Sequence, residues 1–237
     1  MNLVVDQGNT QFKVGIFNDS NLIETFRCNY EKSDELMLNL KSFDIKKIIV
    51  SSVVEKKLNF EFLRAELMTL TSQTNIPIQN QYKTPETLGL DRIANAVGAW
   101  KLNHKANSLV IDLGTCIKYD LVSENGSYLG GNIAPGLQMR FKALYHFTSQ
   151  LPLLAPDRSL KQTHGINTET SIQCGIMDGI NHEIKGFIDR YNKEFSQLTI
   201  FMTGGDLKYF DKRDKKSIFA HQNLTLIGLN EILKHNA

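Results

Sequence analysis

The sequence reads Leu3-Val4-Val5-Asp6-Gln7-Gly8-Asn9-Thr10 near its start, and it repeats this pattern as Leu109-Val110-Ile111-Asp112-Leu113-Gly114-Thr115. The offset is constant at 106 residues, the difference between positions 112 and 6. In both copies a short apolar run leads to an aspartate, and a glycine follows two positions later. Because an internal repeat marks a duplicated structural unit, this pattern predicts two lobes of similar fold.

Each copy is followed by a pattern typical of a β-hairpin, with turns at residues 18–21 and 123–126. Continuous apolar runs at 48–50 and 198–202 predict strands that are buried on both faces. Apolar residues at helical spacing predict helices between these strands. The three helical stripes are Phe60, Leu63, Leu67 and Leu70; Ile93, Val97 and Trp100; and Ile172, Ile176, Ile180, Ile184 and Tyr191. The sequence therefore predicts mixed α/β structure in each half, with the division near residue 106.

The composition is that of an ordinary globular chain, with 237 residues of which 41% are hydrophobic. Its 27 Lys and Arg nearly balance 25 Asp and Glu, which argues against a nucleic-acid binder held mainly by charge. The three cysteines are widely spaced, so we expect neither a disulfide framework nor structural zinc. No signal peptide or long apolar run is present, so we expect a cytoplasmic location and no membrane partner.

Residues 6–13 are a candidate phosphate-binding segment. Gly8 lets the backbone approach a phosphate, Lys13 adds positive charge, and Asp6 could hold Mg²⁺ through water. Taken alone, the segment would equally suit a turn between two strands. The second copy at Asp112 favours a nucleotide, because two such loops facing each other would surround its phosphates. Two facing carboxylates repel each other, so we expect metal ions near Asp6 and Asp112.

Two further segments each have two interpretations, and a third has one. In 89–92, Asp91 could accept a hydroxyl proton and Arg92 could bind a carboxylate, or the segment is a helix cap. Segment 203–206 could lie against an adenosine, or it is a helix-initiating turn with Asp206 as N-cap. The glycine-rich run 130–136 could be a plain strand-to-helix loop. Neither the P-loop nor the Rossmann glycine motif is present, which excludes those two kinds of nucleotide site.

Taken together, these segments resemble those of the type III pantothenate kinases, which belong to the acetate and sugar kinase, Hsp70 and actin superfamily. Any one motif is unspecific, but six in the family's order are strong evidence. The six are D-Q-G-N-T-Q-F-K at 6–13, G-L-D-R at 89–92, D-L-G-T at 112–115, G-G-N-I-A-P-G at 130–136, I-N-T at 166–168 and T-G-G-D at 203–206.

The resemblance implies an α/β fold of two similar ribonuclease-H-like lobes, the actin-like ATPase duplication, with a nucleotide cleft between the lobes. The first lobe would span residues 1–105, with the first phosphate motif and the substrate element. The second would span 106–237, with the second phosphate motif and the adenosine element. The implied reaction is ATP-dependent phosphorylation of pantothenate to 4'-phosphopantothenate, the first step of coenzyme A biosynthesis. Family members are homodimers whose pantothenate pocket lies at the subunit interface.

The resemblance also implies roles for particular residues. Asp91 would be the general base on the pantothenate hydroxyl. Asp112 would bind an activating monovalent cation, K⁺ or NH₄⁺, and ATP would bind with Mg²⁺. The residues implied to contact ATP are Asp6, Gln7, Gly8, Asn9, Thr10, Gln11, Phe12, Lys13 and Thr115. Those implied to bind pantothenate are Tyr82, Gly89, Leu90, Asp91, Arg92 and Thr168.

The sequence departs from the family pattern at two places. Gln7 stands where the family commonly has an aliphatic residue, and Cys116-Ile117-Lys118 replaces a run usually rich in Ala and Thr. Lys118 brings a full charge near the second phosphate loop, unless strand alternation points it away.

Two other functions stay open. One is a nucleotide-binding regulatory or accessory protein of the same fold, and the other is a kinase for another small hydroxyl substrate such as a sugar. The presence of all four of the residues Asp6, Asp91, Arg92 and Asp112 favours an enzyme. Tyr82 and Arg92 suit a carboxylate-bearing acceptor better than an uncharged sugar.

Overall fold

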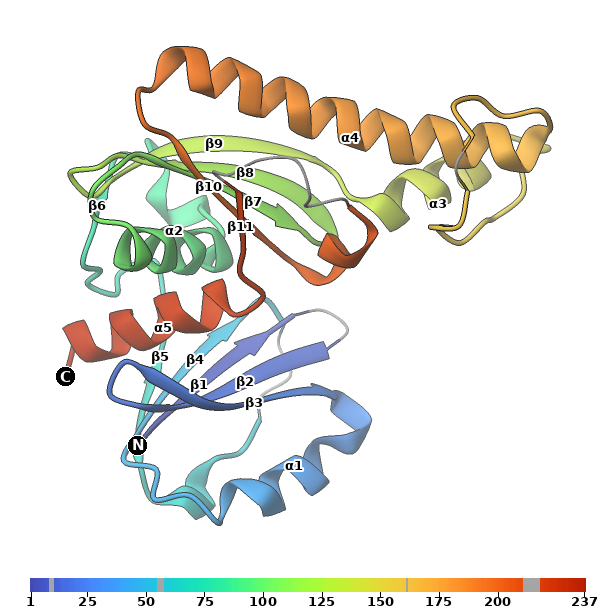
Figure 1. Ribbon diagram of the computed structural model, residues 1–237. Coiled ribbons are helices and arrows are strands. Elements are labelled where there is room, and N and C mark those ends of the chain that lie inside the picture. Colours follow the sequence, from blue (N-terminus) through green and yellow to red (C-terminus); the bar gives the residue numbers. More distant parts are fainter. Residues whose placement is uncertain (9–10, 55–57, 161, 211–217) are drawn as a thin grey trace. The chain divides into compact units, whose positions relative to one another are not determined.

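The computed structural model describes residues 1–8, 11–54, 58–160, 162–210 and 218–237. They form two compact units (Figure 1). The first unit contains Met1–His104, Glu124–Leu129 and Asn223–Ala237, and the second contains Lys105–Ser123 and Gly130–Gln222. The units are defined by which residues pack together, and by this criterion Asn223–Ala237 belong to the first unit. The lobe division at residue 106 follows the strand repeat instead, and it stays a prediction.

The sheet of the first unit has the strand order β3-β2-β1-β4-β5. Strand β1 (Asn2–Gln7) is central, antiparallel to β2 (Gln11–Asn18) and parallel to β4 (Lys47–Ser52). The edges are β3 (Asn21–Asn29) and β5 (Glu66–Thr69). Side chains alternate across such strands, so Leu3 and Val5 of β1 share one buried face. That face is covered by α1 (Ser33–Leu40), whose Leu36 and Leu40 join the same core.

Helix α5 (Leu224–His235) packs against β1, β2 and β4 of this sheet, and α2 (Leu90–Leu102) packs along α5. Buried Asn230 ties α5 to the sheet, because its side chain accepts from Asn2 at 3.0 Å and donates to the Asp19 carbonyl at 2.8 Å. The last helix of the chain is therefore part of the core of the first unit.

The second unit repeats the topology of the first. Its strands run in the order β9-β8-β7-β10-β11, with β9 belonging to it from Gly130 onward, and this order matches β3-β2-β1-β4-β5 strand for strand. The pairing directions also match, since β7 is antiparallel to β8 and parallel to β10, and β10 is parallel to β11. The duplication predicted from the repeated strand motif is confirmed. The bounds are β7 (Ser108–Leu113), β8 (Cys116–Val122), β9 (Ser127–Pro135), β10 (Thr199–Thr203) and β11 (Ile218–Ala220).

One face of this second sheet is covered by α3 (Leu137–Phe147) and the long α4 (Thr168–Glu194) (Figure 1). Isoleucines four residues apart on α4 pack with Leu109, Ile111 and Leu113 of β7. Because strand side chains alternate, Asp112 points to the opposite face of the sheet. Packing of the core face of β7 therefore determines that Asp112 lies on the other face of the sheet.

The sequence prediction of a helix over residues 60–70 is wrong. Residues Glu61–Leu63 form the short 3₁₀ helix η2, which ends at Arg64 with φ 50°, and β5 follows with its residues paired to β4. Pairing with a neighbouring strand outweighs a helical spacing of four apolar residues. The predicted helices over 93–100 and 172–191 are confirmed as α2 and α4.

The glycine-rich run at 130–136 is not a plain loop, since β9 continues to Pro135 and α3 begins at Leu137. The remaining described elements are η1 (Tyr30–Lys32), β6 (Gln79–Asn80), which pairs with the start of β9, η3 (Pro85–Thr87) and η4 (Gly205–Tyr209). Among the helices of the described residues, none has both the length and the apolar composition needed to cross a bilayer.

Candidate functional site

The first phosphate segment is the turn between β1 and β2. Asp6 and Gln7 end β1, Gln11 begins β2, and the predicted contacts Asn9 and Thr10 lie outside the described residues. Two hydrogen bonds hold the turn. The Gly8 amide donates to the Gln11 carbonyl at 3.0 Å, and the Tyr30 hydroxyl donates to the Gly8 carbonyl at 2.8 Å. No local sequence pattern indicates Tyr30, because it reaches the turn through the pairing of β2 with β3.

The side chains of this segment have different surroundings. Phe12 and Gln7 are buried, so only their backbone could reach a ligand, and Gln11 bonds to the Asn29 side chain at 2.7 Å. Lys13 lies directly opposite Asp6 in the strand pairing. Partial burial and the positive charge of Arg27 lower the pKa of Lys13 to about 8, against the opposing effect of Asp6. Lys13 is thus a cation whose charge is lost at mildly alkaline pH.

The second phosphate loop connects β7 to β8. The Gly114 amide donates to the Cys116 carbonyl at 3.2 Å, and the Gly136 amide donates to the Thr115 carbonyl at 3.2 Å. Thr115 is exposed at the tip of this loop. A Cβ on Gly136 would overlap the carbonyl oxygens of Gly114 and Thr115, so this position requires glycine. The end of the glycine-rich run at 130–136 therefore packs directly against the second phosphate loop.

The T-G-G-D segment also lies against this loop. Gly204 has φ 99°, and a Cβ there would overlap the Leu113 carbonyl and lie 2.6 Å from Asp112 Oδ1. Asp206 is within electrostatic range of Asp112, and burial raises the pKa of Asp206, with Asp112 adding to the rise and Lys208 opposing it. The expected N-cap role of Asp206 is wrong, since the cap of η4 is Gly204, with no side-chain hydrogen bond at the cap.

The structure shows on which face of the sheet the Lys118 side chain lies, a point that the sequence left open. It lies directly opposite Asp112 in the β7–β8 pairing, so both side chains stand on the same face of the sheet. Its Nζ is 2.7 Å from Asp112 Oδ2, and the two side chains are only 14% and 13% exposed. A free K⁺ or NH₄⁺ at Asp112 would have to share the carboxylate with this ammonium group. The described residues therefore do not fit a free monovalent cation at Asp112.

A Mg²⁺ ion bound together with a nucleotide needs only one or two side-chain ligands from the protein. Among the described residues no three His, Cys, Asp or Glu side chains are arranged to hold a metal ion. Mg²⁺ in nucleotide sites keeps several waters and is bound through phosphates with one or two carboxylates. Asp6 at the end of β1 fits that role, because it stands beside the turn that would receive the phosphates.

The substrate element lies at the start of α2. Gly89 is the N-cap position, Leu90 is the first helical residue, and Asp91 Oδ1 accepts from the Arg92 amide at 2.9 Å. The Arg92 side chain is buried, and its guanidinium carbon lies 5.6 Å from the Tyr82 ring centre and 6.0 Å from that of Tyr128. The structure thus brings Tyr82, Asp91 and Arg92 together. Tyr128, which the sequence analysis missed, supplies the second ring face.

Thr168 belongs to the second unit, where it is exposed at the first position of α4. The neighbouring Thr170 is engaged in a capping box, in which the Asn167 side chain accepts from the Thr170 amide at 2.9 Å and the Thr170 hydroxyl accepts from the Asn167 amide at 3.2 Å. The Thr168 side chain lines an apolar groove of about 780 Å³ with Leu144, Leu151 and Ile172.

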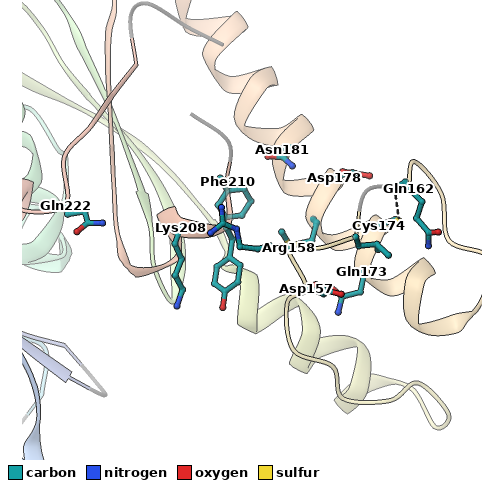
Figure 2. Close-up of a pocket in the computed structure, with 13 residues that line it drawn as sticks. Asp157, Arg158, Gln162, Gln173, Cys174, Asp178, Asn181, Lys208, Phe210 and Gln222 are labelled. Carbon is teal, nitrogen blue, oxygen red and sulfur yellow. Dashed lines mark hydrogen bonds between the residues drawn. The ribbon is translucent and has the colours of Figure 1, made fainter. Parts of the chain in front are cut away.

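A separate polar cleft of about 820 Å³ lies between α4, the segment around Asp157 and the end of η4 (Figure 2). Buried Gln173 holds its wall, since it donates to the Ala155 carbonyl at 2.6 Å and accepts from the Asp157 amide at 3.1 Å. The cleft contains none of the residues predicted from the sequence to bind ATP or pantothenate.

The duplicated sheets with an aspartate loop at the end of each first strand define the class of this protein: it has the fold of the actin-like ATPases and sugar kinases. Two solved structures share this fold. One is described as a Baf family transcriptional activator from Campylobacter jejuni, with a TM-score of 0.64, 22% identity, and coverage of 99% of this chain and 98% of that chain. The other is component A of the (R)-2-hydroxyglutaryl-CoA dehydratase of Acidaminococcus fermentans, with a TM-score of 0.57, 12% identity, and coverage of 99% and 96%. At these identities they show the fold alone.

The chain belongs to the type III pantothenate kinase family, whose model matches residues 2–190. A relative from Phocaeicola vulgatus, named type III pantothenate kinase, is 40% identical over 240 residues, covering 100% of this chain and 99% of the relative. The resemblance inferred from six short motifs is therefore confirmed over the whole length of the chain.

Proposed function

We propose that this protein is a pantothenate kinase that transfers the γ-phosphoryl group of ATP to the hydroxyl of pantothenate, forming 4'-phosphopantothenate in the first step of coenzyme A biosynthesis. The observation that carries the proposal is the family match over residues 2–190, a range that contains the proposed general base and every residue implied to contact ATP or pantothenate. The full-length relative at 40% identity supports the same activity.

Asp91 is the proposed general base. The pantothenate hydroxyl oxygen bonds to the γ-phosphorus while the bond from that phosphorus to the β–γ bridging oxygen breaks, and the hydroxyl proton passes to the Asp91 carboxylate. The position of Asp91 in the first turn of α2 supports this role, because the hydrogen bond from the Arg92 amide fixes one carboxylate oxygen and orients the other.

The phosphate loops are proposed to position ATP. Lys13, the backbone of residues 6–12 and Thr115 are the proposed contacts to its phosphates. Phosphoryl transfer depends chiefly on positioning and charge neutralisation, so these groups would contribute more to the rate than Asp91. Mg²⁺, when bound, neutralises charge on the phosphates, and Asp6 is the residue that would hold it through water.

Arg92 and Tyr82 are the proposed contacts to the carboxylate end of pantothenate, and Gly89, Leu90 and Thr168 are also proposed to contact pantothenate. A guanidinium group stacked on tyrosine rings keeps a fixed orientation, which suits paired hydrogen bonds to a carboxylate. This feature favours pantothenate over an uncharged sugar.

The protein is proposed to act as a homodimer in the cytoplasm. Large apolar side chains are exposed along α3 and the segment that follows it, with Phe147 82%, Tyr145 53%, Leu153 55% and Ile166 78% exposed. Exposed apolar side chains in one segment are typical of a protein interface. They are close in the sequence to Leu144, Leu151 and Thr168, which line the apolar groove, and this supports a substrate pocket at the dimer interface.

The test is an ADP-release assay with ATP and Mg²⁺, in which pantothenate is compared with a panel of sugars and the phosphorylated product is identified by mass. We expect turnover with pantothenate and none with the sugars. Turnover on a sugar would keep the fold and replace the substrate. Folded protein that binds ATP but is silent with every acceptor would point to the regulatory alternative.

A further inference from the structure

The Asp112–Lys118 ion pair is held by the fold and not by chance contact at the surface. Both side chains are mostly shielded from solvent, and their residues are direct partners in the β7–β8 pairing. Shielding strengthens the attraction and limits screening by salt, in contrast to exposed ion pairs. The ammonium group therefore stays beside the carboxylate.

The pair is the counterpart of one in the first unit. Lys13 lies opposite Asp6 in the β1–β2 pairing, as Lys118 lies opposite Asp112, so each copy of the repeat pairs its aspartate with a lysine. Lys118 falls in the run 116–118, where the sequence departs from the family pattern. This departure therefore places the positively charged Lys118 side chain beside Asp112, the residue that the resemblance implies would bind a monovalent cation.

Among the described residues, two ammonium groups act on the carboxylates near Asp112. Asp112 and Asp206 are the carboxylates within electrostatic range of each other, and Lys118 and Lys208 are the ammonium groups that act on them. A K⁺ ion bound at Asp112 would lie next to the Lys118 ammonium and be repelled by it. A lysine side chain carries the single charge and the N–H donors of an ammonium ion.

We propose that the Lys118 ammonium group supplies, as a fixed part of the protein, the positive charge that a monovalent cation would bring to Asp112, so that this kinase does not need K⁺ or NH₄⁺. The inference rests on the proposed kinase function. Lys118 here acts through Asp112 and the second phosphate loop, so it is a positioning residue.

The experiment compares the wild-type protein with Lys118→Thr and Lys118→Arg in KCl, NH₄Cl or tetramethylammonium chloride at a constant total of about 0.1 M, which holds ionic screening equal. Threonine suits a strand and restores a residue type common in the family's run. We expect equal wild-type turnover in all three salts. Lys118→Thr should lose at least about tenfold in tetramethylammonium and regain most of it in K⁺ or NH₄⁺. Lys118→Arg should stay independent of the salt, because it keeps the charge.

A second readout does not depend on turnover. A cation that binds only the folded protein raises its Tm. We expect K⁺ in place of tetramethylammonium to raise the Tm of Lys118→Thr and to leave those of the wild type and of Lys185→Ala unchanged. Lys185 is the control because it is an exposed lysine on α4, so its loss changes the net charge equally.

Stimulation of the wild type by K⁺ or NH₄⁺ over tetramethylammonium would overturn the inference. So would a folded Lys118→Thr protein whose activity no cation restores, or one that is fully active without K⁺. If the wild type phosphorylates no pantothenate in any salt, the proposed function fails instead, and the Tm comparison alone decides whether Lys118 replaces the cation.

Discussion

Asp91 is held close to the backbone of its own helix, since its Oδ1 accepts from the Arg92 amide at 2.9 Å. An asparagine has nearly the same shape and keeps an oxygen for this bond, but it cannot take the proton of the substrate hydroxyl. We expect Asp91→Asn to lower kcat at least about 100-fold while the affinity for ATP stays unchanged. The measurement is steady-state turnover with a separate nucleotide-binding titration.

The matched control for this change is Glu86→Gln, which removes an exposed carboxylate from the neighbouring η3. It should retain full activity. An Asp91→Asn protein with normal turnover would show that another group accepts the proton.

Lys13 gives the proposed ATP site a pH dependence. Because the pKa of Lys13 in the folded protein is about 8, the free protein loses this charge above pH 8, and kcat/KM for ATP should fall there. Lys13→Arg should flatten the alkaline limb, because a guanidinium group stays charged throughout this range. An identical limb in the arginine variant would assign the titration to a different group.

The same residue affects stability with a definite sign. The folded-state pKa lies below the ordinary value of 10.5, so between about pH 8 and 10.5 the unfolded chain binds more protons. Lys13 therefore contributes to stability increasingly as pH rises through this window. Below pH 8 both states are protonated and the cost of burying the charge is fully present.

At the scale of elements, the contact of α2 with α5 depends on close approach. A Cβ on Gly228 of α5 would overlap the Ala94 carbonyl of α2. We expect Gly228→Ala to destabilise the protein by about 1–3 kcal/mol and lower the Tm by several degrees, measured by thermal unfolding.

Gly179→Ala is the control for this substitution. Gly179 is also a helical glycine, on α4, but nothing lies near the position that its Cβ would take. Its Tm should stay equal or rise slightly, because alanine favours the helix. A similar loss in both variants would show that helix propensity, and not the α2–α5 contact, sets the effect.

The elements also show how far a sequence can be interpreted. The strand repeat and the isoleucine stripe of α4 were predictable, because each pattern is long and has a single period. The stripe at 60–70 failed because four residues fit helical spacing by coincidence, and pairing with β4 decided the outcome. At the site, Asp91 and Arg92 were found from a motif, whereas Tyr30 and Tyr128 reach it through strand pairing and ring contacts that no local pattern records.

At the scale of the whole molecule, the exposed apolar segment after α3 leads to a prediction about assembly. Phe147 is 82% exposed, which is costly for a phenylalanine that nothing covers. We expect Phe147→Asp to convert a dimer into a monomer, measured by sedimentation or light scattering. Leu38→Asp on α1, where the leucine is 64% exposed, should leave the mass unchanged. A wild-type protein that sediments as a monomer would refute the proposed dimer.

The return of α5 to the first unit reverses the usual order in which a growing polypeptide matures. Domains generally fold as they emerge during synthesis, with the N-terminal one first. Here the second unit has all its residues once position 222 has been made, whereas the first still lacks the helix at 224–235 that packs on its sheet. The strands of the first sheet leave the ribosome before α5, so we expect the sheet face that α5 packs on to stay uncovered until translation reaches residues 224–235.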